Sequence, residues 1–368
     1  MKIRSMWLPA IAGALFLAGT VAWADFRETQ IASSGEKVEG APFTVKRDWG
    51  TFTLSPKIAE KIKNKEKINY VYSYQASGTS FMSPQMQVGF REGCEWGNKI
   101  MPMNCAIIAP VQFDANQQIS QIDAKLAAGE IDCLSVMPPS ADGANAIIDR
   151  IMSKGIPVFT VGLRTGGHEL SNFTQISIKE GAQAGEVALK WMKDTGHNNI
   201  KVFALSGGDP TQDWAQGRLK GFHEAIAKAI PDAKFVTTEA NPLNTTFDES
   251  KEFDIYKSFL LGHPEVQFIE NVDVGAAFAD RAITELHRVG KVFTIGWNTT
   301  AVQLDAIEAG VQVALLDQQW PDQAAFGALA CAKFLTAGEI LPNTQTLKPV
   351  LKADVPKARE WLATVLKK

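Results

Sequence analysis

The sequence has little cysteine, little histidine and no excess of basic residues. Its 368 residues contain 4 cysteines and 5 histidines, and none of these stands at Cys-x-x-Cys or paired His/Cys spacing. Lys and Arg total 37 against 40 Asp and Glu, which leaves a formal net charge of −3. Such a chain provides neither the basic face that binds nucleic acid nor a polybasic segment for an anionic membrane. We therefore expect no metal site, no nucleic-acid partner and no direct membrane binding.

Long apolar runs are also absent, except at the start of the chain. Lys2 and Arg4 precede an apolar run from Met6 to Ala22, and Ala22-Trp23-Ala24 has the small-x-small pattern that signal peptidase cleaves. No later stretch is long and apolar enough to span a bilayer. We predict that residues 1–24 are a cleaved signal peptide and that the exported, mature chain begins at Asp25; an uncleaved membrane anchor is the alternative.

The four cysteines are too few for a disulfide framework in an exported protein of this size. Cys94 and Cys105 lie close in sequence, so a disulfide closing that short loop is one expectation. Cys133 and Cys331 lie in apolar runs, where a small, buried, reduced side chain is expected.

From Ile68 onward, short apolar runs alternate with amphipathic stretches. With 45% hydrophobic and 21% charged residues, a chain of this length can bury substantial cores and predicts about two domains. The alternation predicts parallel sheets with right-handed helical crossovers, hence an α/β fold with two doubly wound domains. The predicted strands are 68–74, 105–109, 131–137, 157–161, 173–178, 200–205, 234–239, 266–271, 292–295 and 311–316, and the predicted helices include 119–128, 145–154, 182–193, 216–230, 253–261 and 276–289.

Residues 25–66 are a polar extension that precedes this alternation. Ser55-Pro56 supplies an N-cap residue and a proline suited to the first helical position, and KIAEKIKNK follows. One helix is predicted there. The extension either covers a domain surface or is partly disordered.

The most informative stretch is residues 201–222, KVFALSGGDPTQDWAQGRLKGF, which predicts a buried strand, a turn and a crossover helix. Open α/β sheets bind ligands at the carboxyl ends of their strands. This edge has no Gly-Lys-Ser/Thr phosphate loop and no nucleophile supported by histidine. Hydrogen-bonding residues instead surround Trp214, which indicates a site that holds a small polar molecule unchanged, without a cofactor; an ordinary turn with a surface tryptophan is the alternative. These residues are Asp209, Gln212, Asp213 and Gln216.

Several of these motifs, in this order and spacing, resemble one family. Residues 68–352 resemble the periplasmic sugar-binding proteins of ABC transporters related to ribose-binding protein, and also the ligand-binding core of the lac repressor family. The motifs are KVFALSGGDP and GRLKGF within 201–222, GHPEV at 262–266, FTIGWN at 293–298, DQQWPDQAAFG at 317–327, IPVFTVG at 156–162 and AQAGEVALKWM at 182–192.

The resemblance implies a type I periplasmic binding protein fold: a periplasmic monomer with two doubly wound parallel-sheet lobes, three hinge crossings and a ligand cleft between the lobes. We expect the crossings near Ile178, Gln319 and Asn343. The first lobe would then comprise residues 67–178 and 320–343, and the second residues 179–319 and 344–368.

The family's ligand-binding positions map onto this chain only in part. Gln319, in Gln-x-Pro, matches the hinge glutamine, and Asp273 matches the aspartate of an Asn-Asp pair. Asn298 stands where many relatives have an aspartate, and Gln216 where ribose-type proteins have an arginine, so charge is lost at both positions. An amide binds neutral hydroxyls more weakly than a charged group does.

The remaining candidates rest on looser matches. The family has an Asp-Arg pair after the strand that ends here at Val161, and in this chain Arg164 stands one position later than that arginine would. The loop 75–84 is expected to bring Ser80 and Phe81 into the cleft. Phe81 and Trp214 would pack their rings against the C–H face of a sugar, and Asp213 would add a polar group beside Trp214.

Three functions follow from these observations. The favoured one is a periplasmic receptor that captures a monosaccharide, cyclitol or related polyol and delivers it to an ABC import permease. The second is a signalling adaptor whose partner is a chemoreceptor or a sensor histidine kinase. The third is a glycoside hydrolase that uses a pair of carboxylates such as Asp213 and Asp273, although no catalytic motif accompanies them.

Overall fold

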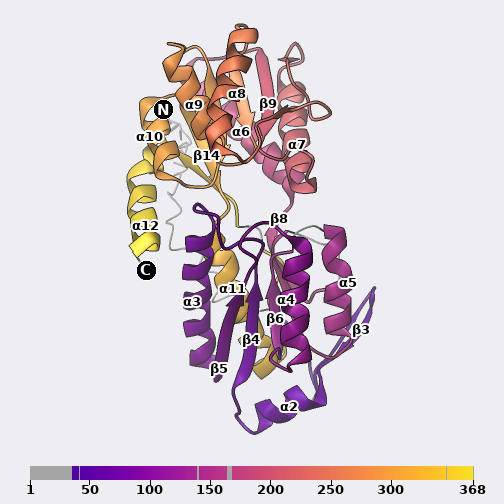
Figure 1. The fold of residues 1–368 in the computed structure, drawn as a ribbon. Helices are drawn as coiled ribbons and strands as arrows, with labels where there is room; N and C mark the ends of the chain where they lie inside the picture. Colours follow the sequence, from indigo (N-terminus) through magenta and orange to yellow (C-terminus); the bar gives the residue numbers. More distant parts are fainter. Residues whose placement is uncertain (1–34, 41, 139–140, 164–167, 345, 368) are drawn as a thin grey trace, which may run out of the picture. The chain divides into compact units, whose positions relative to one another are not determined.

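The computed structural model describes residues 35–40, 42–138, 141–163, 168–344 and 346–367. The predicted signal peptide, residues 1–24, and the candidate Arg164 lie outside the described residues. Figure 1 shows two sheets with helices packed around each of them. Within the described residues, no helix combines the length and the apolar composition needed to cross a membrane.

The first sheet has five parallel strands in the order β5-β4-β6-β7-β8. Helix α3 packs against α11, and both contact this sheet. The strands are β4 (Ile68–Ser73), β5 (Met103–Ile108), β6 (Cys133–Val136), β7 (Val158–Leu163) and β8 (Ser171–Gln175), and the helices are α3 (Ser83–Ile100), α4 (Ala115–Ala127), α5 (Ala141–Met152) and α11 (Trp320–Ala337).

The second sheet runs β10-β9-β12-β13-β14-β16, with β11 also pairing with β9. All of its pairs are parallel except β14 with β16. Its strands are β9 (Val202–Gly207), β10 (Lys234–Phe235), β11 (Leu243–Asn244), β12 (Phe268–Asn271), β13 (Phe293–Trp297), β14 (Gln312–Asp317) and β16 (Lys348–Leu351), and its helices are α6 (Ser177–Thr195), α7 (Asp213–Ala229), α8 (Glu249–Gly262), α9 (Ala276–Glu285), α10 (Ala301–Ala309) and α12 (Val355–Lys367), which the 3-10 helix η1 (Lys352–Asp354) precedes.

Alternation along the strands divides the core of the second sheet into two layers. Phe203 and Phe268 pack with α6 and α7, whereas the next residues, Ala204 and Ile269, pack with α8 and α9. Buried parallel strands need apolar residues on both faces, which is why they read as continuous apolar runs in the sequence. The chain passes between the sheets three times: between β8 and α6, between β14 and α11, and before β16.

Glycine lets α6 and α7 approach each other closely. A Cβ atom on Gly181 would lie 1.9 Å from the carbonyl oxygen of Arg218, and one on Gly221 would lie 2.0 Å from that of Ile178. Any larger residue would force the two helices apart. This contact places Arg218 beside the first turns of α6.

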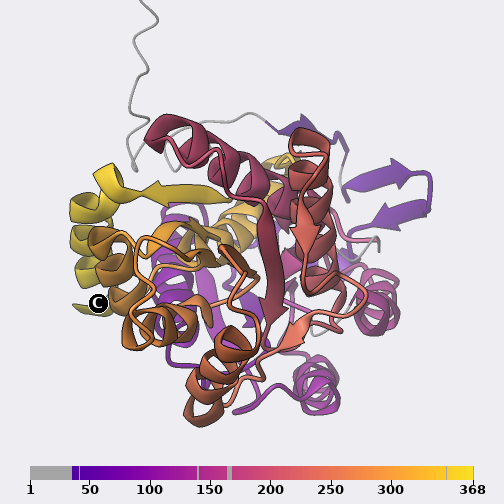
Figure 2. The ribbon, with the colours of Figure 1, turned by 90° about the horizontal axis from the view of Figure 1, so that it is seen from above.

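The described part of the extension is folded. Strand β1 (Glu36–Lys37) pairs with β15 (Glu339–Ile340), β2 (Thr44–Arg47) and β3 (Gly50–Thr53) form a hairpin, and α2 (Pro56–Lys63) begins at the predicted proline. The hairpin lies at the edge of the ribbon in both views (Figures 1 and 2), and Phe52 packs near Phe334 of α11. The described residues between 35 and 63 therefore cover part of the first sheet and its helices.

Two local predictions were wrong. The strand predicted at 234–239 ends at Phe235, because the Thr237 hydroxyl bonds both the backbone nitrogen and the carbonyl oxygen of Leu205, at 2.7 and 2.8 Å, in place of a backbone ladder. The antiparallel strand β16 was not predicted at all. Lys348 and Pro349 interrupt the apolar pattern that marks a strand.

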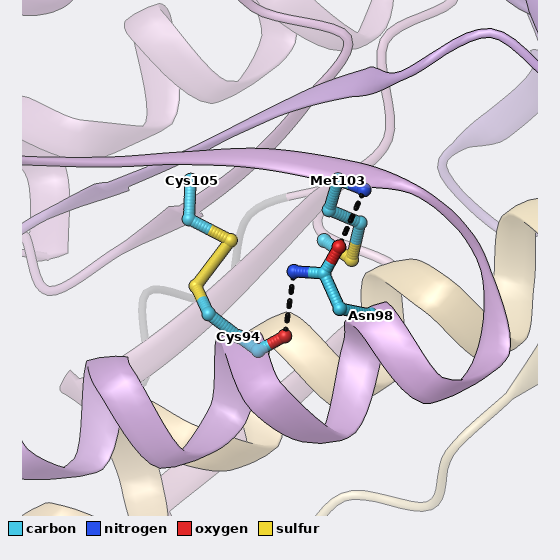
Figure 3. The surroundings of a disulfide bond; sticks show 4 residues. All are labelled: Cys94, Asn98, Met103 and Cys105. Atoms are coloured by element: carbon cyan, nitrogen blue, oxygen red, sulfur yellow. Dashed lines mark hydrogen bonds between the residues drawn. A yellow bond between two sulfur atoms is a disulfide. The ribbon is translucent and has the colours of Figure 1, made fainter.

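All four cysteines are paired. Cys94 of α3 bonds Cys105 of β5, as proposed from their spacing, and the Asn98 amide joins the carbonyl of Cys94 to the backbone nitrogen of Met103 beside it (Figure 3). Cys133 and Cys331, predicted to be reduced, form a second disulfide between β6 and α11. They are 198 residues apart in sequence, and only the packing of α11 on the sheet brings their Cα atoms to 6.2 Å.

Candidate functional site

Three predicted residues meet at the carboxyl edge of the second sheet. Asp273, Asn298 and Gln319 follow the ends of β12, β13 and β14. At this edge, the backbone N–H of Trp297 donates to the carbonyl of Asp273 at 3.0 Å, and the backbone N–H of Asn298 donates to the carbonyl of Leu316 at 2.8 Å. All three predicted residues are at least nine-tenths buried, with exposures of 5%, 4% and 6%. The strand order thus makes neighbours of residues that are far apart in the sequence.

Asp273 is held by the backbone around it. Its Oδ2 accepts a hydrogen bond from the N–H of Gly208 at 2.7 Å, and its Oδ1 accepts one from Gly275 at 2.8 Å. Burial raises the pKa of Asp273, although these two bonds lower it. A carboxylate oxygen accepts more than one hydrogen bond, so this side chain can still accept from a ligand hydroxyl.

Neighbouring side chains hold the backbone of Asp273 in place. Asn271 Oδ1 accepts from the backbone N–H of Asp273 at 2.9 Å, and Asn271 Nδ2 donates to the Tyr256 hydroxyl at 2.8 Å. Glu252 lies next to this group, and burial together with the charge of Asp273 raises its pKa to about 8. These residues fix the acceptor at the edge of the sheet.

Asn298 and Gln319 both have left-handed backbone conformations, with φ values of 67° and 56°. Such conformations are uncommon outside glycine and gather at functional sites. Asp317 secures the second of them: its Oδ1 accepts from both the backbone N–H and the side-chain Nε2 of Gln319, at 2.7 and 2.8 Å. Gln318 Nε2 donates to Asn298 Oδ1 at 2.8 Å. The two amides are therefore oriented by neighbouring side chains.

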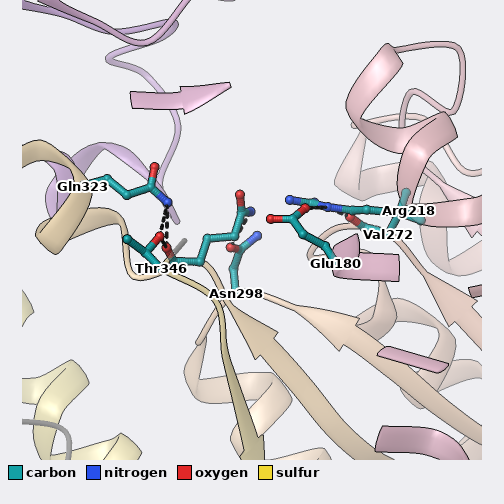
Figure 4. A network of polar contacts seen from close by, with 7 residues as sticks. Glu180, Arg218, Val272, Asn298, Gln323 and Thr346 are labelled. Carbon is teal, nitrogen blue, oxygen red and sulfur yellow. Dashed lines mark hydrogen bonds and ion pairs between the residues drawn. The ribbon is translucent and has the colours of Figure 1, made fainter. Parts of the chain in front are cut away.

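Arg218 connects this edge with the start of α7. Its guanidinium carbon lies 3.9 Å from the ring centroid of Trp297 and 5.1 Å from that of Trp214, so the cation stacks between two indoles. Its Nε donates to Glu180 Oε2 and its Nη1 donates to the carbonyl of Val272, both at 2.8 Å (Figure 4). Arg218 thereby links the predicted Trp214 to Val272, the residue before Asp273.

Two buried carboxyl groups lie near Arg218. Glu180 and Glu270 are buried, and burial raises the pKa of both carboxyls, while Arg218 lowers it. Neither carboxylate oxygen of Glu270 has a hydrogen-bond partner among the described residues. Arg218 is held in place by its ion pair with Glu180, its hydrogen bond to the carbonyl of Val272 and the two indoles on either side of it.

The structure does not join Asp213 or Gln216 to this group. Gln216 turns its Nε2 to the carbonyls of Pro210 and Glu239, at 2.6 and 3.1 Å, which uses its donors inside the loop. Asp213 is an exposed residue at the start of α7. Their roles stay predictions.

The candidates from the first sheet are likewise separate. Ser80 is exposed, and the half-buried Phe81 has its ring centroid 5.7 Å from that of Trp320, the residue after Gln319. Phe81 therefore lies close to the crossing between β14 and α11. Among the described residues, no group of three or more His, Cys, Asp or Glu side chains is placed to hold a metal ion.

Sequence reasoning missed Arg218, Glu180, Asp317 and Gln318. Arg218 lies inside the GRLKGF motif and could have been chosen as a charged residue between apolar helix positions. No sequence signal pairs it with Glu180, 38 residues away. Gln318 and Asp317 were quoted in a motif, but only the crossing geometry reveals what they contact.

Comparisons with known proteins identify the family and the fold. A family model described as a periplasmic binding protein domain matches residues 70–339. The ribose import binding protein of Bacillus subtilis (strain 168) is 25% identical over 236 residues, which are 63% of this chain and 72% of that protein.

Solved structures of lower sequence identity have a similar fold. An ABC transporter solute binding protein from Bacillus halodurans C-125, solved with bound myo-inositol, has a TM-score of 0.67 at 17% identity, covering 80% of this chain and 97% of the other. A glucose-galactose binding protein from Geobacillus stearothermophilus has a TM-score of 0.66 at 20% identity, covering 79% and 99%.

Proposed function

We propose that this chain, which belongs to the periplasmic binding protein family, captures a small polyhydroxylated solute and delivers it to an ABC import permease. Its fold is the type I periplasmic binding protein fold predicted from the sequence, and its relatives are binding proteins rather than enzymes. The solute would be a monosaccharide, a cyclitol or a related polyol. We propose that the chain is exported and acts in the periplasm.

The observation that carries this proposal is the shared edge of Asp273, Asn298 and Gln319. A carboxylate and two amides, all buried and oriented, provide both acceptors and donors for neutral hydroxyl groups. The indole of Trp214, half-buried beside Arg218, supplies an apolar face of the kind that packs on a sugar ring. The relatives named for ribose and for myo-inositol bind solutes of this class.

The proposed lobes are residues 67–178 with 320–343, and 179–319 with 344–368. In this mechanism, an open and a closed arrangement of the lobes interconvert, and ligand favours the closed one because only that arrangement contacts it from both sides. The permease would then recognise the closed form. An affinity near micromolar, about 8 kcal/mol, suits capture followed by release.

A thermal-shift screen tests the proposal. The purified mature chain is heated with D-ribose, D-arabinose, D-allose, D-glucose, D-galactose or myo-inositol, and with ribose 5-phosphate as an anionic control. A ligand that binds only the native state raises the melting temperature in proportion to its saturation. We expect at least one neutral compound to raise it and the phosphate ester to leave it unchanged. If no neutral polyol shifts the melting temperature and none gives heat in calorimetry, the proposed ligand class is wrong.

A further inference from the structure

Asn298 has a single free side-chain group in the described structure. Its backbone N–H donates to the carbonyl of Leu316. Its own carbonyl accepts from Gln303 Nε2 at 2.8 Å, and its Oδ1 accepts from Gln318 Nε2 at 2.8 Å. Its Nδ2 makes no hydrogen bond to any described residue. A primary amide has one oxygen and two N–H donors, so both N–H donors of Asn298 are left for a ligand, while the hydrogen bond from Gln318 turns the amide oxygen, which keeps one lone pair, toward Gln318.

Gln318 is anchored on two other segments of the chain. Its carbonyl oxygen accepts from Gln323 Nε2 of α11 at 2.6 Å and from the hydroxyl of Thr346 at 2.7 Å, and Gln323 also donates to that hydroxyl at 2.9 Å. In Figure 4, Gln323 and Thr346 lie on one side of Asn298, and Glu180 and Arg218 lie on the other. With only 7% of the residue exposed, the backbone of Gln318 is fixed while its side chain spans to the next strand end.

We infer that Gln318 is a positioning residue that holds Asn298 with its N–H donors, rather than its oxygen, directed at the bound solute. The inference rests on the proposed function and adds a preference to it: at this point Asn298 favours a solute that offers a hydrogen-bond acceptor, such as a ring oxygen or the lone pair of a hydroxyl. An aspartate at position 298 would demand a donor there instead. Gln318 and Asn298 thus act as a pair.

Substitutions at Gln318 test the direction of this hydrogen bond. Gln318→Leu removes the contact and releases Asn298, while Gln318→Glu introduces a carboxylate that can only accept, so that Asn298 must donate to it and turn its oxygen to the ligand. We expect about tenfold weaker binding for Gln318→Leu and a larger loss for Gln318→Glu, measured by calorimetry with the tightest binder among D-ribose, D-arabinose, D-allose, D-glucose, D-galactose and myo-inositol. Undiminished affinity in Gln318→Glu would overturn the inference.

The same substitutions in an Asn298→Ala background separate positioning from a structural role. If Gln318 acts through Asn298, its replacement should change affinity less than twofold once Asn298 is truncated. A purely structural role at the crossing would cost the same affinity in both backgrounds, which contradicts the inference. Gln87→Leu, an exposed glutamine of α3, is the matched control and should bind like the parent.

A ligand-free measurement keeps this inference distinct from the proposed function. In NMR spectra, the side-chain amide signals of Asn298 are identified by their loss in Asn298→Ala. We expect Gln318→Leu to shift these signals and Gln87→Leu to leave them in place. Unshifted signals in Gln318→Leu refute the role of Gln318 whatever binds. Shifted signals together with no binder in the panel uphold the positioning and count against the proposed ligand class.

Discussion

At the residue scale, the candidate site is built from side chains whose own hydrogen bonds decide what they can offer a ligand. Gln319 donates one N–H of its Nε2 to Asp317, so its side-chain oxygen and its second N–H are the groups available to a solute hydroxyl. Asp273 retains acceptor capacity after its bonds to Gly208 and Gly275. A neutral polyol meets both acceptors and donors at this edge, which is what hydroxyl groups require.

Truncation of Gln319 should weaken binding without unfolding the protein. We expect Gln319→Ala to cost roughly 1–3 kcal/mol of affinity, because a hydroxyl buried on ligand binding would lose its partner. The backbone N–H at this position would still bond Asp317, so the turn should persist. Isothermal titration with the best polyol, alongside a melting curve, measures both effects. Parent-like affinity would remove Gln319 from the site, and Gln87→Ala serves as the control.

Removal of the Trp214 ring should have a different signature. Trp214 is the second residue of α7 and is half-buried, so the fold should tolerate Trp214→Ala. Loss of an apolar face against the solute should weaken binding by about 1 kcal/mol, while Trp214→Phe should retain most of the affinity. Titration of the pair decides: equal binding by both variants and the parent would mean that Trp214 only covers Arg218.

At the scale of elements, each disulfide attaches a helix to a strand of the first sheet. Cys94–Cys105 joins α3 to the neighbouring β5 across 11 residues, whereas Cys133–Cys331 joins β6 to α11 across 198. Helix α11 begins directly after Gln319, so the second disulfide fixes the helix that starts at the crossing. A cross-link between distant positions restricts the unfolded chain more than a local one does.

The long-range disulfide should therefore contribute more stability. From loop length alone, we expect about 5 kcal/mol for Cys133–Cys331 and about 3 kcal/mol for Cys94–Cys105, as upper values for the chain-entropy effect. Denaturant unfolding of the two double Cys→Ala variants compares them, and peptide mapping without reduction checks the pairing. The opposite ranking, or free thiols at Cys133 and Cys331, would contradict this prediction.

At the scale of the whole molecule, the second sheet and its helices bury many acidic groups. Burial raises the pKa of Asp280 to about 8, although the Thr294 hydroxyl, 2.5 Å from its Oδ1, lowers it. Burial and the nearby charge of Asp273 likewise raise the pKa of Glu252 to about 8. An unfolded chain would ionise such carboxyls near pH 4. Above that pH, the folded state therefore binds protons that the unfolded state has lost.

Stability should consequently fall as the pH rises from about 4 to about 8, since the folded state binds more protons across this window. Asp280→Asn removes one of these titrations. We expect the variant to gain stability relative to the parent by roughly 1 kcal/mol or more between pH 5 and pH 8, because each pKa unit corresponds to about 1.4 kcal/mol. Denaturant unfolding at both pH values measures the difference.

The exposed Asp194, which pairs with Lys190 on α6, provides the control. Asp194→Asn should change stability by less than about 1 kcal/mol at either pH, as exposed ion pairs do. An Asp280→Asn variant whose stability runs parallel to that of the parent from pH 5 to pH 8 would show that Asp280 ionises freely in the folded protein.

The sequence by itself determined the fold class, the family and most of the alternation of strands and helices from Ile68 onward. Apolar runs and amphipathic stretches are local signals. Each predicts a strand or a helix from the residues of that segment alone. The same holds for α2 after Ser55-Pro56. Asp273, Asn298 and Gln319 were predictable as neighbours because parallel strands end at a common edge. The resemblance supplied their proposed roles.

Only the tertiary structure decided which side chains meet across long separations. Cys133 with Cys331, Arg218 with Glu180, and Gln318 with Asn298 are pairs created by strand order and helix packing. Nothing local to either partner records the contact, since a cysteine in an apolar run looks the same whether it is free or bonded. The orientation of the amides at the edge was also beyond the sequence, because an amide can donate or accept and its neighbours in space make the choice.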